Sequence, residues 1–191
     1  VLRGISASDR FARAGKWKNG AFPLQREVTG RRVGILGLGR IGQEVATRLE
    51  GFRCEIGYHN RNEVETSYRY FGGAEELAGW AEVLVVLTPG GAATKALVDA
   101  DVLAALGPEG YLVNIARGTV VDEDALVQAL NDATIAGAGL DVYPNEPHIN
   151  EALMALDNVV LTPHIASGTR ETRRAMADTV LENVRTWLAD G

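Results

Sequence analysis

Residues 33–49 read VGILGLGRIGQEVATRL: an apolar run, three spaced glycines, and then an amphipathic pattern with helical spacing. In a turn from a strand to a helix, Gly37 allows the tight bend and Gly39 lets the backbone approach a pyrophosphate. Gly42 lets the helix pack close to the strand, and the free N–H groups at the start of the helix face the phosphates. Because strand, glycines and helix follow in this order, the stretch predicts a dinucleotide-binding turn.

Strand-like and helix-like patterns alternate along the rest of the chain. Short runs rich in Val, Ile and Leu are typical of strands buried on both faces of a parallel sheet. These runs lie at 33–36, 82–87, 110–115, 134–142 and 158–162. Amphipathic helical patterns lie at 41–52, 122–130 and 170–189. The alternation predicts an α/β fold with a doubly wound parallel sheet, a Rossmann-type NAD(P)-binding domain, over residues 30–191.

The first 29 residues have a different pattern. They contain a helical segment with Phe11 and Trp17 and then a connection that includes Gly and Pro. This segment has no obvious place inside the sheet, so residues 1–29 are predicted to form an arm or hinge helix that packs on another domain or subunit. Packing on its own domain is an equal alternative. The chain starts at Val1 and not at Met, and we expect further residues upstream.

Composition and charge narrow the class of protein. The chain has 191 residues, 46% of them apolar and 23% charged, which suits one globular domain with a full core. The net charge of −6 argues against a nucleic-acid or anionic-membrane surface. Cys54 is the single cysteine, which rules out an internal disulfide and favours a reducing, cytoplasmic setting. No apolar run approaches the ~18 residues of a membrane span.

A further strand is expected at RCEIGY (53–58), after the glycine turn and its helix, and the tip of this strand bears on the choice of cofactor. Dinucleotide-binding folds usually have an acidic residue there, which binds the ribose hydroxyls and repels a 2′-phosphate. This sequence has His59, Asn60 and Arg61 instead. Asn60 can donate a hydrogen bond and Arg61 can grip a phosphate with two, so the tip favours NADP(H). NAD(H) remains the alternative, because Glu63 or Glu65 would serve as the ribose acid if the strand ended later.

Three further strand ends carry side chains suited to acid–base chemistry. Arg117 follows the apolar run at 110–115, and its planar fork matches a carboxylate. Asp141 and Glu146 follow the next run, and His164 follows the last one. Ligands of open α/β sheets bind at the carboxyl ends of the strands, so these residues are expected on the same edge as the glycine turn. Each could instead have a structural role, but their coincidence at one edge favours a catalytic site.

Four motifs together resemble one enzyme family. They are GLGRIG (37–42), IARG (115–118), DVYPNEP (141–147) and TPHIASGT (162–169), and in order and spacing they resemble the D-isomer-specific 2-hydroxyacid dehydrogenases. The resemblance covers nearly the whole chain and matches the nucleotide-binding domain of that family with its preceding arm. It implies that a substrate-binding domain is absent from this chain, and that the domain and its arm form a homodimer.

The resemblance also implies roles for residues. His164 would be the general acid/base, Glu146 would hydrogen-bond its other ring nitrogen, Arg117 would bind the substrate carboxylate, and Asp141 would bind the nicotinamide carboxamide. The cofactor contacts carried over are Gly37, Gly39, Arg40, Ile41, Gly42, His59, Asn60, Arg61, Leu87, Thr88, Pro89, Thr94, Ile115, Ala116, Arg117, Asp141, His164 and Ala166. No metal site is expected.

The predicted activity is hydride transfer between NADP(H), or NAD(H), and C2 of a small 2-keto or 2-hydroxy acid. Members of the family that reduce glyoxylate or hydroxypyruvate with NADPH often have a polar or basic tip like 59–61, which points to those substrates. Ala166 stands where the family often has Gly, and the loop around Thr94 lacks the acid that often precedes the threonine. The alternatives are a dehydrogenase for phosphoglycerate or phosphite, and a nucleotide-sensing module like the co-repressors related to this family. The isolated domain is expected to bind nucleotide but to turn over poorly.

Overall fold

A seven-stranded parallel sheet forms the body of the protein in a computed structural model that describes residues 1–190. The strand order is β3-β2-β1-β4-β5-β6-β7, so the chain winds outward in both directions from the centre of the sheet. The strands are β1 Arg32–Leu36, β2 Glu55–His59, β3 Arg69–Tyr70, β4 Val83–Val86, β5 Tyr111–Asn114, β6 Gly137–Leu140 and β7 Val159–Leu161. This topology confirms the predicted doubly wound α/β fold.

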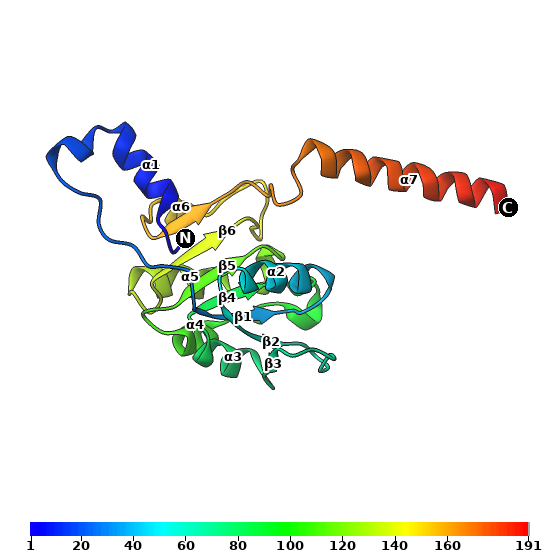
Figure 1. Cartoon of the computed structure of the whole chain (residues 1–191), viewed down its shortest axis with the longest axis horizontal. Coiled ribbons are helices and arrows are strands. Elements are labelled where there is room, and N and C mark those ends of the chain that lie inside the picture. The colour runs from blue at the N-terminus through cyan, green and yellow to red at the C-terminus, as the bar shows by residue number, and fades with distance from the viewer. Residues whose placement is uncertain (191) are drawn as a thin grey trace.

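Helices connect the strands and cover both faces of the sheet (Figure 1). They are α1 Ile5–Arg13, α2 Arg40–Glu50, α3 Ala74–Trp80, α4 Ala100–Leu106, α5 Glu123–Asn131, α6 Glu151–Met154 and α7 Arg170–Asp190, with short 3-10 turns η1 Lys16–Asn19, η2 Ala92–Thr94 and η3 Gly118–Val120. The sequence patterns predicted α2, α5 and α7 to within about two residues, as far as helix boundaries are defined. They did not single out α3, α4, α6 or the two-residue strand β3.

The core is divided between the two faces of the sheet. The larger cluster lies under α3, α4 and α5 and includes Leu77, Leu103 and Leu126, all almost fully buried. The smaller cluster lies under α2 and includes Ile35 and Tyr58. Near β5 and β6 this second face is covered in part by the first residues of the chain: a Cβ at Gly139 would lie 2.7 Å from the Val1 side chain, and Leu2 packs against the cluster.

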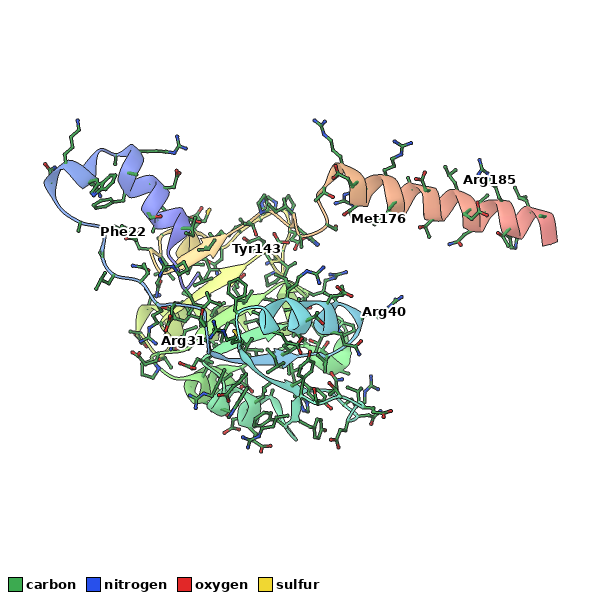
Figure 2. The ribbon with its side chains drawn as sticks, viewed as in Figure 1. Phe22, Arg31, Arg40, Tyr143, Met176 and Arg185 are labelled. Carbon is green, nitrogen blue, oxygen red and sulfur yellow. The ribbon has the colours of Figure 1, made fainter. Side chains whose placement is uncertain are left out.

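Helices α1 and α7, near the two ends of the chain, are not packed into the body of the protein (Figure 1). Helix α1 has no buried residue and stands beside the β7 edge of the sheet, where Phe11 meets Phe22 edge to face. Helix α7 projects into solvent, and Figure 2 shows the side chains of Met176 and Arg185 on it well clear of the sheet. Its exposed residues include large apolar ones, among them Val180 and Trp187. None of the described helices is long and apolar enough to cross a membrane.

The register of the sheet aligns the strand ends in one row. Leu36 pairs with Val86, Val86 with Asn114, Asn114 with Leu140, and Leu140 with Leu161. On the other side Leu36 pairs with the last residue of β2. The loops that follow these strands therefore all start at the same level, along one edge of the sheet.

Candidate active site

The glycine turn after β1 has the shape required for a dinucleotide. Gly37 has φ of 108°, and a Cβ there would lie 2.7 Å from the Thr88 backbone nitrogen. A Cβ at Gly42 would lie 2.5 Å from the Gly37 carbonyl oxygen, so the helix packs directly on the turn. Around Gly39, by contrast, no atom lies within 4 Å of such a Cβ. The open side of the turn is thus at the glycine that a pyrophosphate would approach.

The start of α2 leaves donors available beside this open space. Gly39 is the N-cap, and no side chain caps the helix. The first N–H groups of a helix need partners and attract anions. The hydroxyl of Thr88, next to the turn, is buried and has no hydrogen-bond partner within the described chain. These features fit a phosphate-bearing group at this place.

The β2 tip lies against the same turn. Asn60 Oδ1 accepts a hydrogen bond from the Leu38 N–H at 2.7 Å, and its Nδ2 donates to the Leu38 carbonyl at 3.3 Å. His59 Nδ1 lies 2.8 Å from the Phe71 carbonyl oxygen. Arg61 is exposed. Of the three tip residues predicted to bind the cofactor, two therefore make contacts inside the protein, and Arg61 remains open to solvent.

The turn after β5 holds Arg117 at the mouth of a cleft. Asn114 is buried, its Oδ1 accepts from the Ala116 N–H at 3.1 Å, and its Nδ2 donates to the Arg117 carbonyl at 3.1 Å. Arg117 Nη1 donates to the Ala116 carbonyl at 2.6 Å. Asp122 lies beyond this turn and caps α5 through the Ala125 N–H.

His164 and Glu146 form a pair on the neighbouring loops. His164 Nδ1 lies 2.7 Å from Glu146 Oε2, while Glu146 Oε1 accepts from the Tyr143 N–H at 3.0 Å. The hydrogen bond from His164, helped by that from Tyr143, holds the pKa of Glu146 below its ordinary value. Because Nδ1 is engaged, Nε2 is the ring nitrogen left for a substrate. His164 has φ of 52°, an unusual backbone conformation for a residue other than glycine.

Asp141 anchors the loop that carries the histidine. Its carboxylate accepts from the Thr162 hydroxyl at 2.5 Å and from the N–H groups of Ile165 and Ala166 at 2.9 Å each. Burial would raise the pKa of Asp141, but these hydrogen bonds outweigh it and lower that pKa. The residue predicted to bind the nicotinamide carboxamide is therefore mostly engaged within the protein, although a carboxylate has acceptor capacity for one further bond.

A cleft of about 490 Å³ brings the three predicted catalytic residues together. It is lined by Gly90, Gly91, Arg117, Gly118, Thr119, Tyr143, Pro144, Glu146 and His164. A cation, a carboxylate and an imidazole thus share one cleft on the edge that holds the glycine turn. This set can bind an acid and exchange a proton with it.

The remaining residues predicted to contact the cofactor lie along the same edge of the sheet. Some are exposed, and others already use their polar groups in hydrogen bonds within the protein. Arg40 and Ile41 are exposed at the start of α2. The Thr94 hydroxyl donates to the Pro89 carbonyl at 2.7 Å. The N–H groups of Ile115 and Ala116 are both used inside the protein, by Val86 and Asn114 respectively.

The sequence profile of the D-isomer specific 2-hydroxyacid dehydrogenase NAD binding domain matches residues 1–166. The chain belongs to this family. It is 49% identical to hydroxyphenylpyruvate reductase of Plectranthus scutellarioides over 96% of the chain and 59% of that protein. It is 47% identical to 2-ketogluconate reductase of Gluconobacter oxydans over 100% of the chain and 62% of that protein. The predicted family is thereby confirmed.

A solved structure of the same family is very similar. It is the NADPH-dependent glyoxylate/hydroxypyruvate reductase of Sinorhizobium meliloti in complex with NADP and malonate, with a TM-score of 0.96 and 47% identity. The match covers 100% of this chain and 60% of that one. This 2-hydroxyacid dehydrogenase domain therefore spans about 60% of the length of the relatives that it matches.

Sequence reasoning missed three residues that shape the site of this dehydrogenase domain. Asn114 donates to the Arg117 carbonyl, the Thr162 hydroxyl donates to Asp141, and the Tyr143 hydroxyl lies within hydrogen-bond distance of two carbonyl oxygens, 3.1 Å from that of Leu140 and 3.0 Å from that of Thr162. Asn114 and Thr162 had a visible signal, because each is a polar residue at the end of an apolar run, YLVN (111–114) and NVVLT (158–162). Such a residue is buried, wholly or in part, with the end of the strand and must find hydrogen-bond partners close by.

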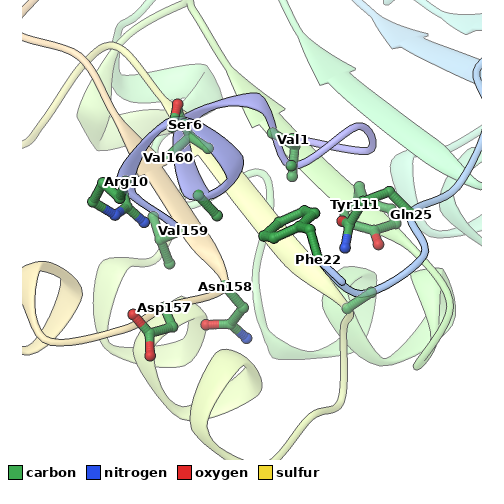
Figure 3. Close-up of a pocket in the computed structure, with 13 residues that line it drawn as sticks. Val1, Ser6, Arg10, Phe22, Gln25, Tyr111, Asp157, Asn158, Val159 and Val160 are labelled. Carbon is green, nitrogen blue, oxygen red and sulfur yellow. The ribbon is translucent and has the colours of Figure 1, made fainter. Parts of the chain in front are cut away.

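A second hollow lies away from the catalytic edge, between α1 and the start of β7 (Figure 3). Its volume is about 230 Å³, and Arg10, Asp157 and Phe22 are among its lining residues. It shares no residue with the cleft around Arg117, so it has no direct part in the chemistry of that cleft.

Proposed function

We propose that the chain is the nucleotide-binding part of a reductase that uses NADPH to reduce the 2-keto group of a small acid, with glyoxylate or hydroxypyruvate as the favoured substrate. The observation that carries the proposal is the cleft that joins Arg117 to the Glu146–His164 pair on the edge of the glycine turn. The names of the relatives support the substrate class.

In this proposal the chain's own residues bind the acid and move a proton. The guanidinium of Arg117 binds the substrate carboxylate with the N–H groups that the Ala116 carbonyl does not use. His164 gives a proton from Nε2 to the 2-keto oxygen, and Glu146 orients the ring and stabilises its charged form. The bound nicotinamide supplies the hydride that adds to C2. Hydride and proton together convert the ketone to the alcohol, and the reverse reaction returns both.

We further propose that residues 30–191 form the nucleotide domain, that 1–29 form an arm, and that a second domain completes the cleft. The proposal is supported by the length of the relatives and by the unpartnered apolar side chains of α7, among them Met176 and Trp187. Without a second wall, water reaches the site, so the 191-residue chain should bind nucleotide and turn over poorly. A cytoplasmic location is proposed, in keeping with the free thiol of Cys54.

Gly39→Ala should abolish most nucleotide binding and leave the fold intact. The new methyl meets no protein atom within 4 Å, but it stands where the pyrophosphate would approach. We expect the Kd for NADPH, measured by fluorescence titration, to rise at least about tenfold with little change in Tm. Gly73→Ala is the matched control, because Gly73 is also an N-cap with open space around it, at α3. A wild-type Kd for Gly39→Ala would contradict the proposed binding mode.

Arg61→Ala should weaken NADPH selectively. The exposed guanidinium is placed at the β2 tip, and a charge-assisted contact to the 2′-phosphate would contribute about 10- to 100-fold in affinity. NADH lacks this phosphate, so its Kd should change less than about threefold. Arg48→Ala, which removes an exposed arginine paired with Glu44 on α2, controls for net charge. An unchanged ratio of the two Kd values would exclude Arg61 as the selector.

We propose that the chain forms a homodimer in which the arm takes part. Trp17 is 76% exposed on the arm, and Leu24, farther along the arm, is fully exposed. We expect sedimentation velocity at increasing concentration to show a dimer, and Trp17→Ser to raise its dissociation constant at least about tenfold. Trp187→Ser on α7 removes an equally exposed tryptophan and serves as the control. A monomer at all concentrations would refute the proposal.

A further inference from the structure

The middle of the glycine turn is tied to the β2 tip by a single side chain. Leu38 lies between the two glycines of the turn, and Asn60 meets both of its backbone polar groups, at 2.7 Å for the N–H and 3.3 Å for the carbonyl. The N–H of Gly37 adds a bond to the His59 carbonyl at 3.0 Å. The turn is therefore held from the neighbouring strand, on the side away from Thr88.

Asn60 is itself fixed by its surroundings. The Tyr70 hydroxyl donates to the Asn60 carbonyl at 3.3 Å, and the His59 ring is bonded to Phe71 and stacked on Tyr70. Both aromatic residues belong to the edge of the sheet around β3. Asn60 and its two bonds to Leu38, here called the clamp, therefore fix the glycine turn to the β3 edge of the sheet.

The chemistry of the clamp requires an amide. Leu38 presents one donor and one acceptor, and a carboxamide of this length satisfies both at once. An aspartate at 60 would still accept from the Leu38 N–H, but it would place negative charge against the Leu38 carbonyl. The second hydrogen on Nδ2 is free to bond the cofactor directly. An experiment must therefore distinguish a direct contact with the cofactor from a role in holding the turn.

We propose that Asn60 is a positioning residue for the pyrophosphate site, which acts through Leu38, and not a ligand of the 2′-phosphate. This inference rests on the proposed binding of a dinucleotide. It follows that two neighbouring residues at the β2 tip have different effects on cofactor binding. Asn60 sets the affinity for NADH and NADPH alike, and Arg61 alone sets the preference between them.

Titration of the chain with NADH and with NADPH tests these separate roles of Asn60 and Arg61. For Asn60→Ala we expect the Kd values for NADH and NADPH to rise together, each about tenfold, with their ratio constant within about twofold. Loss of NADPH affinity alone would mean that Asn60 binds the 2′-phosphate, and unchanged affinity for both would mean that it does not position the turn. Either result overturns the inference.

Hydrogen exchange at the Leu38 amide gives a second readout, which needs no ligand. The amide should exchange faster in Asn60→Ala and stay protected in Asn60→Asp, which retains the acceptor. Asn60→Asp also serves if Asn60→Ala does not fold: it retains the acceptor for the Leu38 N–H, so loss of the Leu38 protection in this variant would also refute the clamp. Equal protection of Leu38 in the wild type and Asn60→Ala would refute the clamp.

Different results would contradict the proposed function and the inference on Asn60. If Arg61→Ala leaves the ratio of Kd values unchanged, Arg61 is not the selector, and if the wild type binds NADH as tightly as NADPH, the proposed NADPH preference is wrong; in both cases the effect of Asn60→Ala on NADH still decides the role of Asn60. If the wild-type chain binds neither nucleotide, the proposed function fails and the inference fails with it.

Discussion

His164→Gln should lower kcat for reduction of glyoxylate or hydroxypyruvate about 10³-fold in the enzyme that contains this domain, with a much smaller change in KM. Glutamine has no group that donates and regains a proton near neutral pH. Arg117, which would bind the carboxylate, is untouched. Steady-state assays with NADPH provide the measurement.

His148→Gln is the matched control for this substitution. His148 is exposed and follows the Glu146 loop, but it does not line the cleft around Arg117. Its replacement should leave kcat within about twofold. If His164→Gln retained the wild-type kcat, the proton would have to come from elsewhere and the proposed mechanism would be wrong.

The same variant should change the titration of Glu146, and this can be measured in the chain alone. The hydrogen bond from His164 is the main cause of the lowered pKa, so in His164→Gln the pKa of Glu146 should move up toward its ordinary value. In the wild type, the lowered pKa of Glu146 makes the stability of the fold depend on pH. The Glu146–His164 pair stabilises the fold fully above the ordinary pKa of glutamate, and this stabilisation is lost as pH falls through the lowered pKa. NMR titration of the side-chain carboxyl resonance tests this expectation.

Gly118→Ala should destabilise the protein by about 3 kcal/mol. The added methyl would overlap the backbone of Tyr143 and Pro144, which belongs to the loop that carries Glu146. Backbone atoms cannot rotate away as a flexible side chain can. To accept the methyl, the Arg117 turn and the Glu146 loop must separate, so the variant should also weaken the binding of acids to the cleft. Urea denaturation measures the stability.

Gly79→Ala gives the opposite expectation and serves as its control. Gly79 lies in α3, and the nearest atom to an added Cβ is the Ala105 carbonyl oxygen at 3.9 Å. Alanine is a better helix former than glycine, so this variant should gain up to about 1 kcal/mol. If both alanines changed stability equally, the close approach of the two loops at Gly118 would not exist in solution.

Patterns that are local in sequence predicted the elements that position the site. The apolar runs located the main strands, and the glycine spacing identified the turn at 37–42. Motifs at strand ends then placed Arg117, Glu146 and His164 on one edge, because the carboxyl ends of parallel strands meet there. The short strand β3 and helix α6 lack enough residues for a periodic signal.

The sequence could not show which polar groups are already engaged. Asn60 looked like a cofactor donor, but its amide meets Leu38, which lies in a different loop. Asp141 looked free to bind the nicotinamide, but it holds Thr162 and the loop beyond it. Both contacts join segments about 20 residues apart, and they depend on the register of neighbouring strands. The pattern within one segment alone does not show which residue of the other segment it will meet.

The anchoring of the His164 loop by Asp141 has a mechanical consequence. Helix α7 begins at Arg170, so any body attached to it pulls on a chain that leads back to the histidine. The N–H groups of Ile165 and Ala166 are fastened to a buried carboxylate at the end of β6. The position of the His164 loop is therefore set by contacts within the nucleotide domain, whatever direction α7 takes.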